Sequence, residues 1–550
     1  MTTMRREADT ILKNGRIWTG DAAVPWASDL AIAGGRVLAT GGDLSHLAGP
    51  GTEVIDLGGR MAMPGVHDVH LHFLMGGREE LFYVRFPTSF GFEKIFAFLK
   101  ERIAARPGEP VIGGAWGSEP GALIGRLDAL QALDAATGEV PVLLYDESHH
   151  NLWANTAAMR AAGLSADTPD VADGTIVRDR ATGALTGLFL EEAKQLFKDF
   201  VREVLPQTPE REMQAALAAV AKLNRYGITG FHEAATSRVS LDVLRSIDRA
   251  GQLSAWSVCS LPHAPFNGED GAGEAFWTEG EGYRSEQIFP TYAKFFLDGV
   301  PPARTAAFVE PYLPTPDGLP GGHGDLYYTT EELAGLIERA EMLGLASKMH
   351  GSGDAAVRQA LDAIAMVRAV RPGPAPLHHI AHASFIVPED IARFAPLNAV
   401  ADLCPVFWFP TSTSLACLDV LGAERTNRFW PNKDLHDAGA LLAAGSDWPV
   451  VPEPNPWIGI EGMITRANPM GEVKGVLGVD QALDLDTVLR IYTANAARAM
   501  GIGHLAGTLA PGMSADIVVL DRNLFEIAPT EIGRTEVVMT LFRGRMVYRT

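Results

Sequence analysis

The sequence has few of the features that mark secreted, membrane or nucleic-acid-binding proteins. Its 550 residues include only three cysteines, Cys259, Cys404 and Cys417, and no two of them have CxxC spacing. This argues against a disulfide framework or a thiolate zinc cluster and fits a reducing compartment. The formal net charge of −21 leaves no basic excess to neutralise phosphates, so we expect neither nucleic acid nor an anionic membrane as a partner.

Long apolar runs are also lacking. No uninterrupted apolar run reaches the roughly 18 residues that a membrane span needs. The first fifteen residues, MTTMRREADTILKNG, have no apolar segment after their basic residues, so no signal peptide is predicted and the cytoplasm is the expected location. An apolar fraction of 47% and a charged fraction of 21% are ordinary for a globular protein, and the length favours more than one domain.

Both ends of the chain are rich in predicted strands. Alternating or β-branched apolar residues, broken by Asn-Gly and Gly-Gly turns, predict strands at Thr10–Trp18, Asp29–Ala39, Glu53–Asp56, Ala515–Asp521, Glu536–Phe542 and Arg545–Tyr548. Because the two ends share this character, we expect one small β domain, built from residues 1–64 and 491–550.

The middle of the chain alternates predicted strands with predicted helices. The strands are Gly227–His232, Tyr292–Asp298, Leu345–His350, Leu377–His382, Ala399–Cys404 and Ala440–Asp447; the helices include Glu331–Leu343 and Ala355–Val367. Such βα units imply a parallel sheet. Polar residues recur at the C-terminal ends of these strands, which in a closed barrel meet at one mouth, so we predict a (β/α)₈ TIM-like barrel at 65–490. Residues from about 79 to 222 exceed a normal βα connection and are predicted to form an inserted lid.

The most informative motif is Met63-Pro-Gly-Val-His-Asp-Val-His70-Leu-His72. Alternation along a strand puts His70 and His72 on one face, where two imidazoles can hold one divalent metal ion. A pair of packed or surface histidines is the structural alternative.

Three further metal-type ligands stand where an apolar strand gives way to a loop. His350 ends LASKMH, His382 ends LHHIAH, and Asp447 ends ALLAAGSD. Each could be a satisfied core residue, and Asp447 could cap the following loop. Their occurrence in barrel order favours a metal-dependent active site at the mouth.

On these motifs the chain resembles the amidohydrolase superfamily and, more closely, its YtcJ-like branch, which includes the N-substituted formamide deformylases. The resemblance runs nearly end to end, through LKNGRIWTGD, MPGVHDVHLH, PVLLYDESHHNLWANTAA, GALTGLFLEEA, GITGFHEA, KFFLDG, KMHGSGDAAV, HHIAH, AAGSDWPV, YTANAARAMG and GTLAPGMSADIVVLD. One departure is that branch members often carry Arg-Ile-Glu-His where this chain has His379-Ile-Ala-His382, which puts the usual partner of that ligand in doubt.

The resemblance implies a β-sandwich domain beside the barrel and a role for each strand-end residue. His70 and His72 would bind the more buried metal ion, and His350 and His382 a second one. Asp447 would contact the metal and the activated water, take its proton and return it to the leaving nitrogen.

A bridge between two metal ions is implied by the same resemblance. Lys294 lies inside the apolar run YAKFFLDG, where an unpaired ammonium is costly to bury, and carboxylation would make it an anionic bridging ligand. The alternative is a snorkelling lysine, or one paired with Asp298. Glu191, in GLFLEEA, is a competing bridge that could also be a helix-start carboxylate.

Four other residues are candidate substrate contacts. His150 and Asn155, in HHNLWAN, are placed on the inserted region, where they could reach the substrate from above. His232 ends GITGFH and could line the mouth, and Trp448 directly follows Asp447. Each could equally be structural.

Together these features predict a metal-dependent hydrolase that cleaves an amide-type carbon–nitrogen bond in a small, apolar or aromatic molecule. Hydrolysis of a cyclic amide, ester or lactone, or deamination, would use the same site, and a catalytically silent binding protein is a remoter alternative. His and carboxylate ligands favour zinc, one or two ions per chain, over manganese, iron or cobalt. The oligomeric state is left open, a homodimer included.

Overall fold

A computed structural model describes residues 7–550 except 122, 147–150, 172–173, 267, 316–317, 408–409 and 472. The chain divides into two compact units. The first comprises Met1–Phe73, Val220–Trp448 and Glu453–Thr550, and the second comprises Leu74–Ala219 and Pro449–Pro452.

The first unit is built around an eight-stranded parallel sheet. Its strands lie in the order β21-β20-β19-β18-β17-β16-β15-β8. Their bounds are β8 Val66–Leu71, β15 Ile228–Glu233, β16 Trp256–Pro262, β17 Ile288–Phe296, β18 Ala346–Gly351, β19 His378–His382, β20 Ala399–Leu403 and β21 Leu441–Ala444. Beyond β21 the chain continues alongside β8, where the Asp447 amide donates to the His70 carbonyl and the His72 amide to the Trp448 carbonyl, both at 2.7 Å. These bonds join the two ends of the sheet, so the predicted barrel is confirmed.

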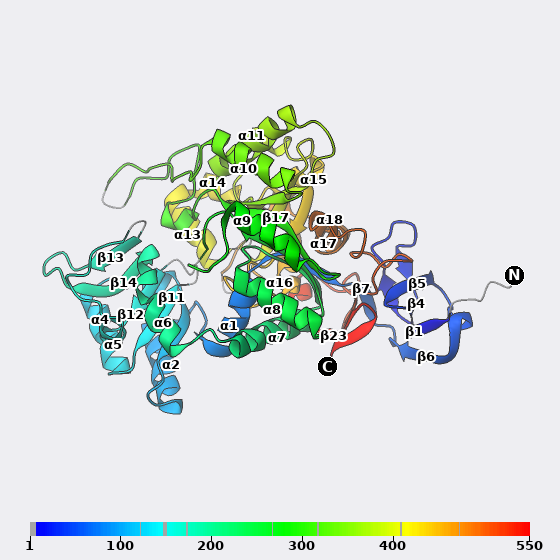
Figure 1. The fold of residues 1–550 in the computed structure, drawn as a ribbon, viewed down its shortest axis with the longest axis horizontal. Coiled ribbons are helices and arrows are strands. Elements are labelled where there is room, and N and C mark those ends of the chain that lie inside the picture. Colours follow the sequence, from blue (N-terminus) through cyan, green and yellow to red (C-terminus); the bar gives the residue numbers. More distant parts are fainter. Residues whose placement is uncertain are drawn as a thin grey trace. The chain divides into compact units, whose positions relative to one another are not determined.

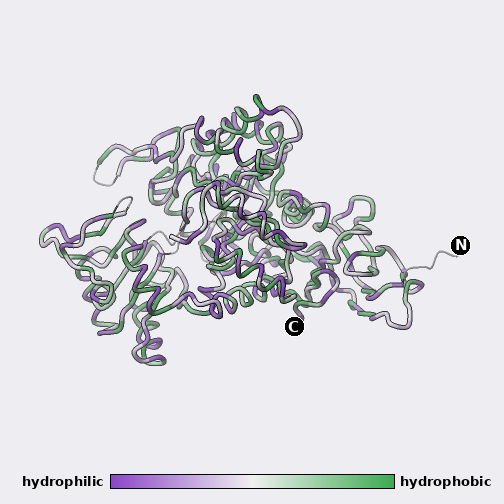
Figure 2. The backbone as a smooth tube through the Cα atoms, in the orientation of Figure 1, coloured by the Kyte–Doolittle hydropathy of each residue, from purple (hydrophilic) through white to green (hydrophobic). Residues whose placement is uncertain are grey.

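Helices follow the barrel strands and lie outside the sheet (Figure 1). They include α8 Arg238–Arg249, α9 Gly273–Gly280, α10 Thr330–Met342, α11 Asp354–Val370, α15 Asn432–Asp437, α17 Leu485–Tyr492 and α18 Ala494–Ala499, whereas α7 Pro209–Arg225 begins in the second unit and ends in the first. Hydrophobic and hydrophilic residues alternate along them (Figure 2), as expected where one face packs on the sheet. Helix α10 begins at a capping box formed by Thr329 and Glu332, which satisfies its first backbone amides.

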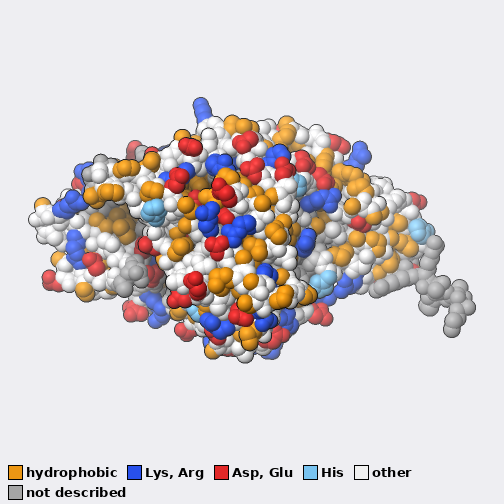
Figure 3. Space-filling view, turned by 90° about the horizontal axis from the view of Figure 1, so that it is seen from above, with side chains coloured by type: hydrophobic (Ala, Val, Ile, Leu, Met, Phe, Trp, Pro, Cys, Tyr) orange, Lys and Arg blue, Asp and Glu red, His pale blue; other side chains and the backbone are white. Residues whose placement is uncertain are grey.

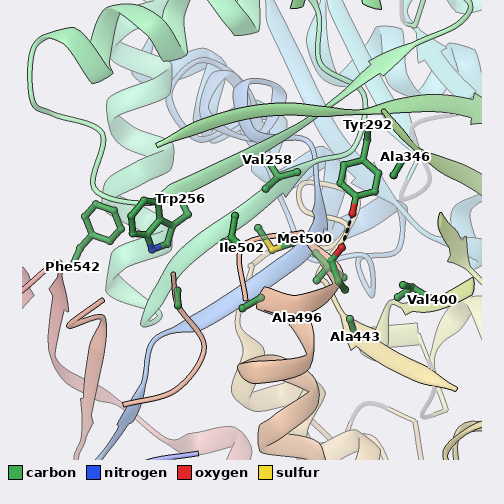
Figure 4. Close-up of a cluster of buried hydrophobic side chains, with 14 residues drawn as sticks. Trp256, Val258, Tyr292, Ala346, Val400, Ala443, Ala496, Met500, Ile502 and Phe542 are labelled. Atoms are coloured by element: carbon green, nitrogen blue, oxygen red, sulfur yellow. Dashed lines mark hydrogen bonds between the residues drawn. The ribbon is translucent and has the colours of Figure 1, made fainter. Parts of the chain in front are cut away.

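An apolar cluster fills the part of the barrel next to α18 (Figure 4). Val258 and Val400 come from opposite strands, and Met500 and Ile502 follow α18 into the same cluster. The buried Tyr292 hydroxyl donates to the Ala499 carbonyl at 2.5 Å. This packing places α18 at one end of the barrel, next to β8 and β21.

Two sheets built from both chain ends form the β domain that the sequence predicts. One has the order β5-β4-β1-β6 and the other β24-β23-β22-β7-β2-β3. Their bounds are β1 Ala8–Lys13, β2 Arg16–Trp18, β3 Trp26–Ala27, β4 Asp29–Ala33, β5 Arg36–Gly41, β6 Ala48–Asp56, β7 Met61–Pro64, β22 Ile517–Leu520, β23 Val537–Phe542 and β24 Arg545–Arg549. Side chains such as Leu12, Ile32, Val519 and Leu541 pack between the sheets in one core.

The strand predicted at Thr10–Trp18 is two strands. Asn14 adopts φ 55°, a left-handed conformation that breaks the strand, and β1 and β2 join different sheets. The Asn-Gly pair therefore moves the chain from one sheet of the sandwich to the other, because Asn tolerates this conformation better than most residues.

The second unit has its own sheet and core. Its sheet has the order β13-β14-β12-β11-β10-β9. The elements are β9 Val84–Arg85, α2 Phe92–Ala105, β10 Val111–Trp116, α4 Leu127–Thr137, β11 Val142–Asp146, β12 Asn151–Ala154, α5 Thr156–Ala161, β13 Gly174–Arg178, β14 Leu185–Glu191 and α6 Lys198–Val204. Leu143, Leu152, Phe189 and Phe197 are among its fully buried side chains.

The surface carries acidic and basic side chains interspersed with hydrophobic ones over the face seen in Figure 3. Among the described residues, no helix combines the length and apolarity needed to cross a bilayer.

Candidate metal centre

The two histidines of β8 and the aspartate after β21 come together inside the barrel. His70 and His72 are 1% and 8% exposed, and Asp447 is 6% exposed. The Asp447 Oδ1 atom lies 3.6 Å from Nε2 of each histidine. Two imidazole nitrogens and one carboxylate oxygen therefore surround a single point, an arrangement suited to one divalent metal ion.

The backbone holds Asp447 in this position. The residue has φ 61°, in the left-handed region, and its amide is bonded to the His70 carbonyl. The residue two before it is Gly445, where a Cβ atom would lie 2.4 Å from the His70 amide nitrogen, so only glycine allows this approach. Asp68 accepts from the amides of His70 at 3.1 Å and Ser446 at 3.0 Å, which ties the two segments together.

His350 and His382 lie next to this trio. The His382 ring centroid is 4.7 Å from that of His70 and 4.6 Å from that of His350. Asp298 orients His350 by accepting from its Nδ1 atom at 3.1 Å, and it also accepts from the Ser352 amide at 3.0 Å. The structure thus brings together all four predicted histidines, and Asp298 fixes the ring of one of them.

Lys294 is buried in the barrel on β17, with 1% exposure. Burial, together with the nearby Lys348 ammonium, lowers the pKa of its amine to about 7 against the opposing effect of Asp402 and Asp447. Its ammonium lies 4.8 Å from the Phe296 ring centroid. Since the Asp298 carboxylate is used by His350 and by backbone amides, the structure does not pair Lys294 with Asp298.

A buried polar network beneath the histidines escaped the sequence analysis. Lys348 donates to Asp402 and, at 2.8 Å, to the Val69 carbonyl, and both charged side chains are fully buried. Asp402 also accepts from His379 Nδ1 at 3.0 Å and lies 3.7 Å from His70 Nδ1. One signal in the sequence could have found it: Lys348 precedes His350 by two residues on the same strand and therefore faces the barrel interior on the same side.

Breaking this network should destabilise the protein strongly. We expect Lys348→Met to lower the free energy of unfolding by about 3–5 kcal/mol, because it leaves the Asp402 carboxylate buried without its cation. Thermal unfolding followed by circular dichroism measures the loss. The double variant Lys348→Met/Asp402→Asn should recover part of it; equal stability of Lys348→Met and the natural protein would contradict the structure.

His232 and Trp448 are more deeply placed than the sequence analysis expected. His232 is fully buried, and its Nε2 atom is bonded to Ser260 Oγ at 2.6 Å. Its ring packs 4.6 Å from Tyr292, whose hydroxyl contacts the Ala499 carbonyl. Trp448 is also fully buried, and Lys222 lies 6.0 Å from its ring centroid. Both side chains contribute to packing in this structure.

Two predicted residues that the structure describes, Asn155 and Glu191, belong to the second unit. Asn155 is fully buried and caps α5: its oxygen accepts from the amides of Val142 and Ala158, and its nitrogen donates to Thr137 and Val140. All of its hydrogen-bonding capacity is therefore used within the unit. Glu191 ends β14 with φ 50°, and His150 lies outside the described residues.

The protonation of the site makes metal affinity depend on pH. Burial raises the pKa of Asp447 to about 7, whereas burial holds the pKa values of His70 and His382 well below 6.5. In the metal-free protein His70 and His382 are therefore already neutral, and a metal ion has to displace a proton from Asp447 as pH falls below about 7.

Below about pH 7 we expect zinc affinity to fall about tenfold more per pH unit than it does above pH 7, because the Asp447 proton must then be displaced as well. Competition with a chromophoric chelator across this range measures the slope. Asp447→Asn should flatten it, and an unchanged slope in that variant would assign the proton to another group.

Comparison with known proteins adds independent findings. The model of the Amidohydrolase family matches residues 53–548. The chain is 28% identical over 507 residues to the putative amidohydrolase YtcJ of Bacillus subtilis, with 91% of each chain covered. It is 26% identical over 572 residues to an N-substituted formamide deformylase of Arthrobacter pascens, covering 100% of this chain and 99% of that one. The solved structure of an uncharacterised metal-dependent hydrolase from Pyrococcus horikoshii superposes with a TM-score of 0.73 at 25% identity, covering 94% of this chain and 99% of that one.

Proposed function

The chain belongs to the amidohydrolase family, and from this premise we propose that it hydrolyses an amide-type carbon–nitrogen bond in a small apolar or aromatic molecule. The observation that carries the proposal is the convergence of His70, His72 and Asp447, with ligand atoms within 4.8 Å of one another at the mouth of a barrel. In such barrels, polar residues at the C-terminal ends of the strands perform the chemistry.

The donor set fits a divalent transition metal ion. The buried trio offers two neutral nitrogen donors and one oxygen donor, a combination typical of zinc and shared by manganese, iron and cobalt. His350 and His382 are close enough to supply a second position. An ion bound here supplies the Lewis acidity that activates water and polarises a carbonyl group.

The protein's own residues would then handle the proton and the geometry. Asp447, whose carboxylate lies 3.6 Å from the imidazoles of His70 and His72, would take a proton from the attacking water and return it to the leaving nitrogen. Asp298 orients His350 through Nδ1, and Asp68 fixes the backbone between His70 and Ser446, so the reacting groups are held in place before substrate arrives.

Lys294 is the proposed bridge between two ions. A pKa of about 7 leaves much of its amine neutral at neutral pH, and a neutral amine adds to carbon dioxide, losing one proton and forming a carbamate. The carbamate would replace a buried cation with an anionic oxygen ligand. Glu191 remains the competing candidate.

Aromatic residues beside the histidines support an apolar substrate. Phe266 stacks on the His72 ring at 5.1 Å, and Phe296 stacks on Phe266 at 5.2 Å. Both phenylalanines are partly exposed, unlike Trp448. They form an aromatic wall next to the catalytic groups, a feature common in pockets for small apolar molecules.

A substrate panel tests the proposal. Metal-loaded protein should hydrolyse N-substituted formamides and other neutral aryl amides with higher kcat/KM than matched charged amides, esters or aminated heterocycles. Asp447→Asn serves as the control for contaminating activity. Preference for the ester, the heterocycle or the charged amide would overturn the proposed substrate class.

A further inference from the structure

Cys404 lies within the cluster of candidate ligands, although the function proposed above does not use it. The residue follows β20 and is fully buried. Its Sγ atom is 3.5 Å from His382 Nδ1, and Sγ, the His382 nitrogen and an Asp447 oxygen all lie within 4.8 Å of one another. A soft sulfur donor therefore joins a nitrogen and an oxygen donor around a second point in the site.

The distance between the Cys404 sulfur and the His382 nitrogen agrees with both atoms binding the same metal ion. Zinc–sulfur and zinc–nitrogen bonds of about 2.3 and 2.0 Å, at a tetrahedral angle, separate the two donor atoms by about 3.5 Å. The observed distance between Sγ and Nδ1 is 3.5 Å. An S–H···N hydrogen bond is compatible with the same distance, so a second observation has to distinguish the two interpretations.

The Asp447 carboxylate supplies that observation. Although the residue is 6% exposed, no hydrogen bond to its carboxylate is found within the described part of the chain. Its nearest charged or imidazole partners are His70 and His72 at 3.6 Å, beyond hydrogen-bonding distance. A buried carboxylate left without a donor, facing imidazoles and a thiol, is the environment expected where a cation binds.

We propose that Cys404 is a thiolate ligand that, with His382 and Asp447, holds a divalent metal ion in this site. This inference rests on the proposed metal-dependent function and deepens it by naming the ion's class. Binding replaces the thiol proton, which passes to solvent, and forms a metal–sulfur bond. A thiolate favours zinc, cadmium and cobalt over manganese and magnesium, so the site is selective for softer ions.

The chain provides matched controls because it has three free, buried cysteines. Cys259 lies on β16, with its Sγ atom 3.7 Å from Ser257 Oγ, and Cys417 lies on α13 (Ser412–Leu421). Among the described residues, neither belongs to a group of candidate metal ligands. The substitutions Cys259→Ser and Cys417→Ser therefore change a buried thiol without touching the site.

The experiment is cobalt substitution of the full-length protein, followed by near-ultraviolet absorption. We expect a thiolate-to-cobalt charge-transfer band in the natural protein, Cys259→Ser and Cys417→Ser, and its loss in Cys404→Ser and Cys404→Ala, measured at equal bound cobalt. The ratio of zinc to manganese affinity should fall at least about tenfold in the Cys404 variants.

Two results would overturn the inference in distinguishable ways. Bound cobalt with no charge-transfer band, or a band that survives Cys404→Ser and Cys404→Ala, removes the thiolate ligand but leaves the proposed hydrolase intact. Failure of the natural protein to bind cobalt or zinc at all would refute the metal-dependent function together with this inference.

Discussion

Asp447→Asn is expected to lower kcat by about a thousandfold or more while the protein keeps its metal. An amide cannot take a proton from water or return one to the leaving nitrogen, and the loss of a positioned acid–base group together with its charge has effects of this size. The substituted side chain is close to isosteric, and the backbone bond from residue 447 to the His70 carbonyl does not depend on the carboxylate. Steady-state kinetics on the best substrate measures the effect.

Metal content and folding control this experiment. The variant should retain its metal at pH 8, because the imidazoles of His70 and His72 remain, and its circular dichroism spectrum should be unchanged. Activity within tenfold of the natural protein, with metal bound, would show that another group transfers the proton. Asp68 would then be the first to examine, since burial raises its pKa to about 7 and it lies beside the same backbone.

Lys294→Ala is expected to abolish most activity and to weaken metal loading. If the lysine carbamate bridges two ions, its removal takes away one oxygen ligand from each, and the space left can admit a small carboxylate. Acetate or propionate should therefore restore part of both the metal content and the rate. Elemental analysis and turnover, measured with and without added acid, test this together.

Glu191→Ala is the matched comparison for that experiment. A bridging glutamate predicts the reverse pattern, in which Glu191→Ala loses metal and Lys294→Ala keeps it. Full activity of Lys294→Ala without any added acid would eliminate the carbamate. A gain in activity when carbon dioxide is supplied to metal-free natural protein during reloading would support it.

The sequence was sufficient to predict the barrel and the convergence of the four histidines inside it. Apolar strands that end in His350 or His382 are visible as patterns, and because parallel strand ends meet at one mouth, a linear pattern becomes a three-dimensional prediction. The β domain was predicted because both chain ends carry strand patterns, whereas the middle of the chain alternates strands with helices. Asn14 shows the limit, because one expected strand divides there between two sheets.

The interactions beneath the site were not accessible from the sequence. Lys348 and Asp402 are separated by 54 residues, and only the barrel register makes them partners. Cys404 was interpreted only as evidence against a disulfide framework or a thiolate zinc cluster, because its contact with His382 depends on two neighbouring strands. Asn155, conversely, was considered for substrate binding because it lies in a family motif, whereas the structure shows that it caps a helix.

The most direct test of metal-dependent hydrolysis by this protein is turnover of purified protein before and after complete metal removal, with bound metal measured by elemental analysis. We expect one to two transition-metal ions per chain, loss of hydrolysis when they are removed, and recovery when zinc is returned. Full turnover of protein shown to contain no metal would contradict this expectation.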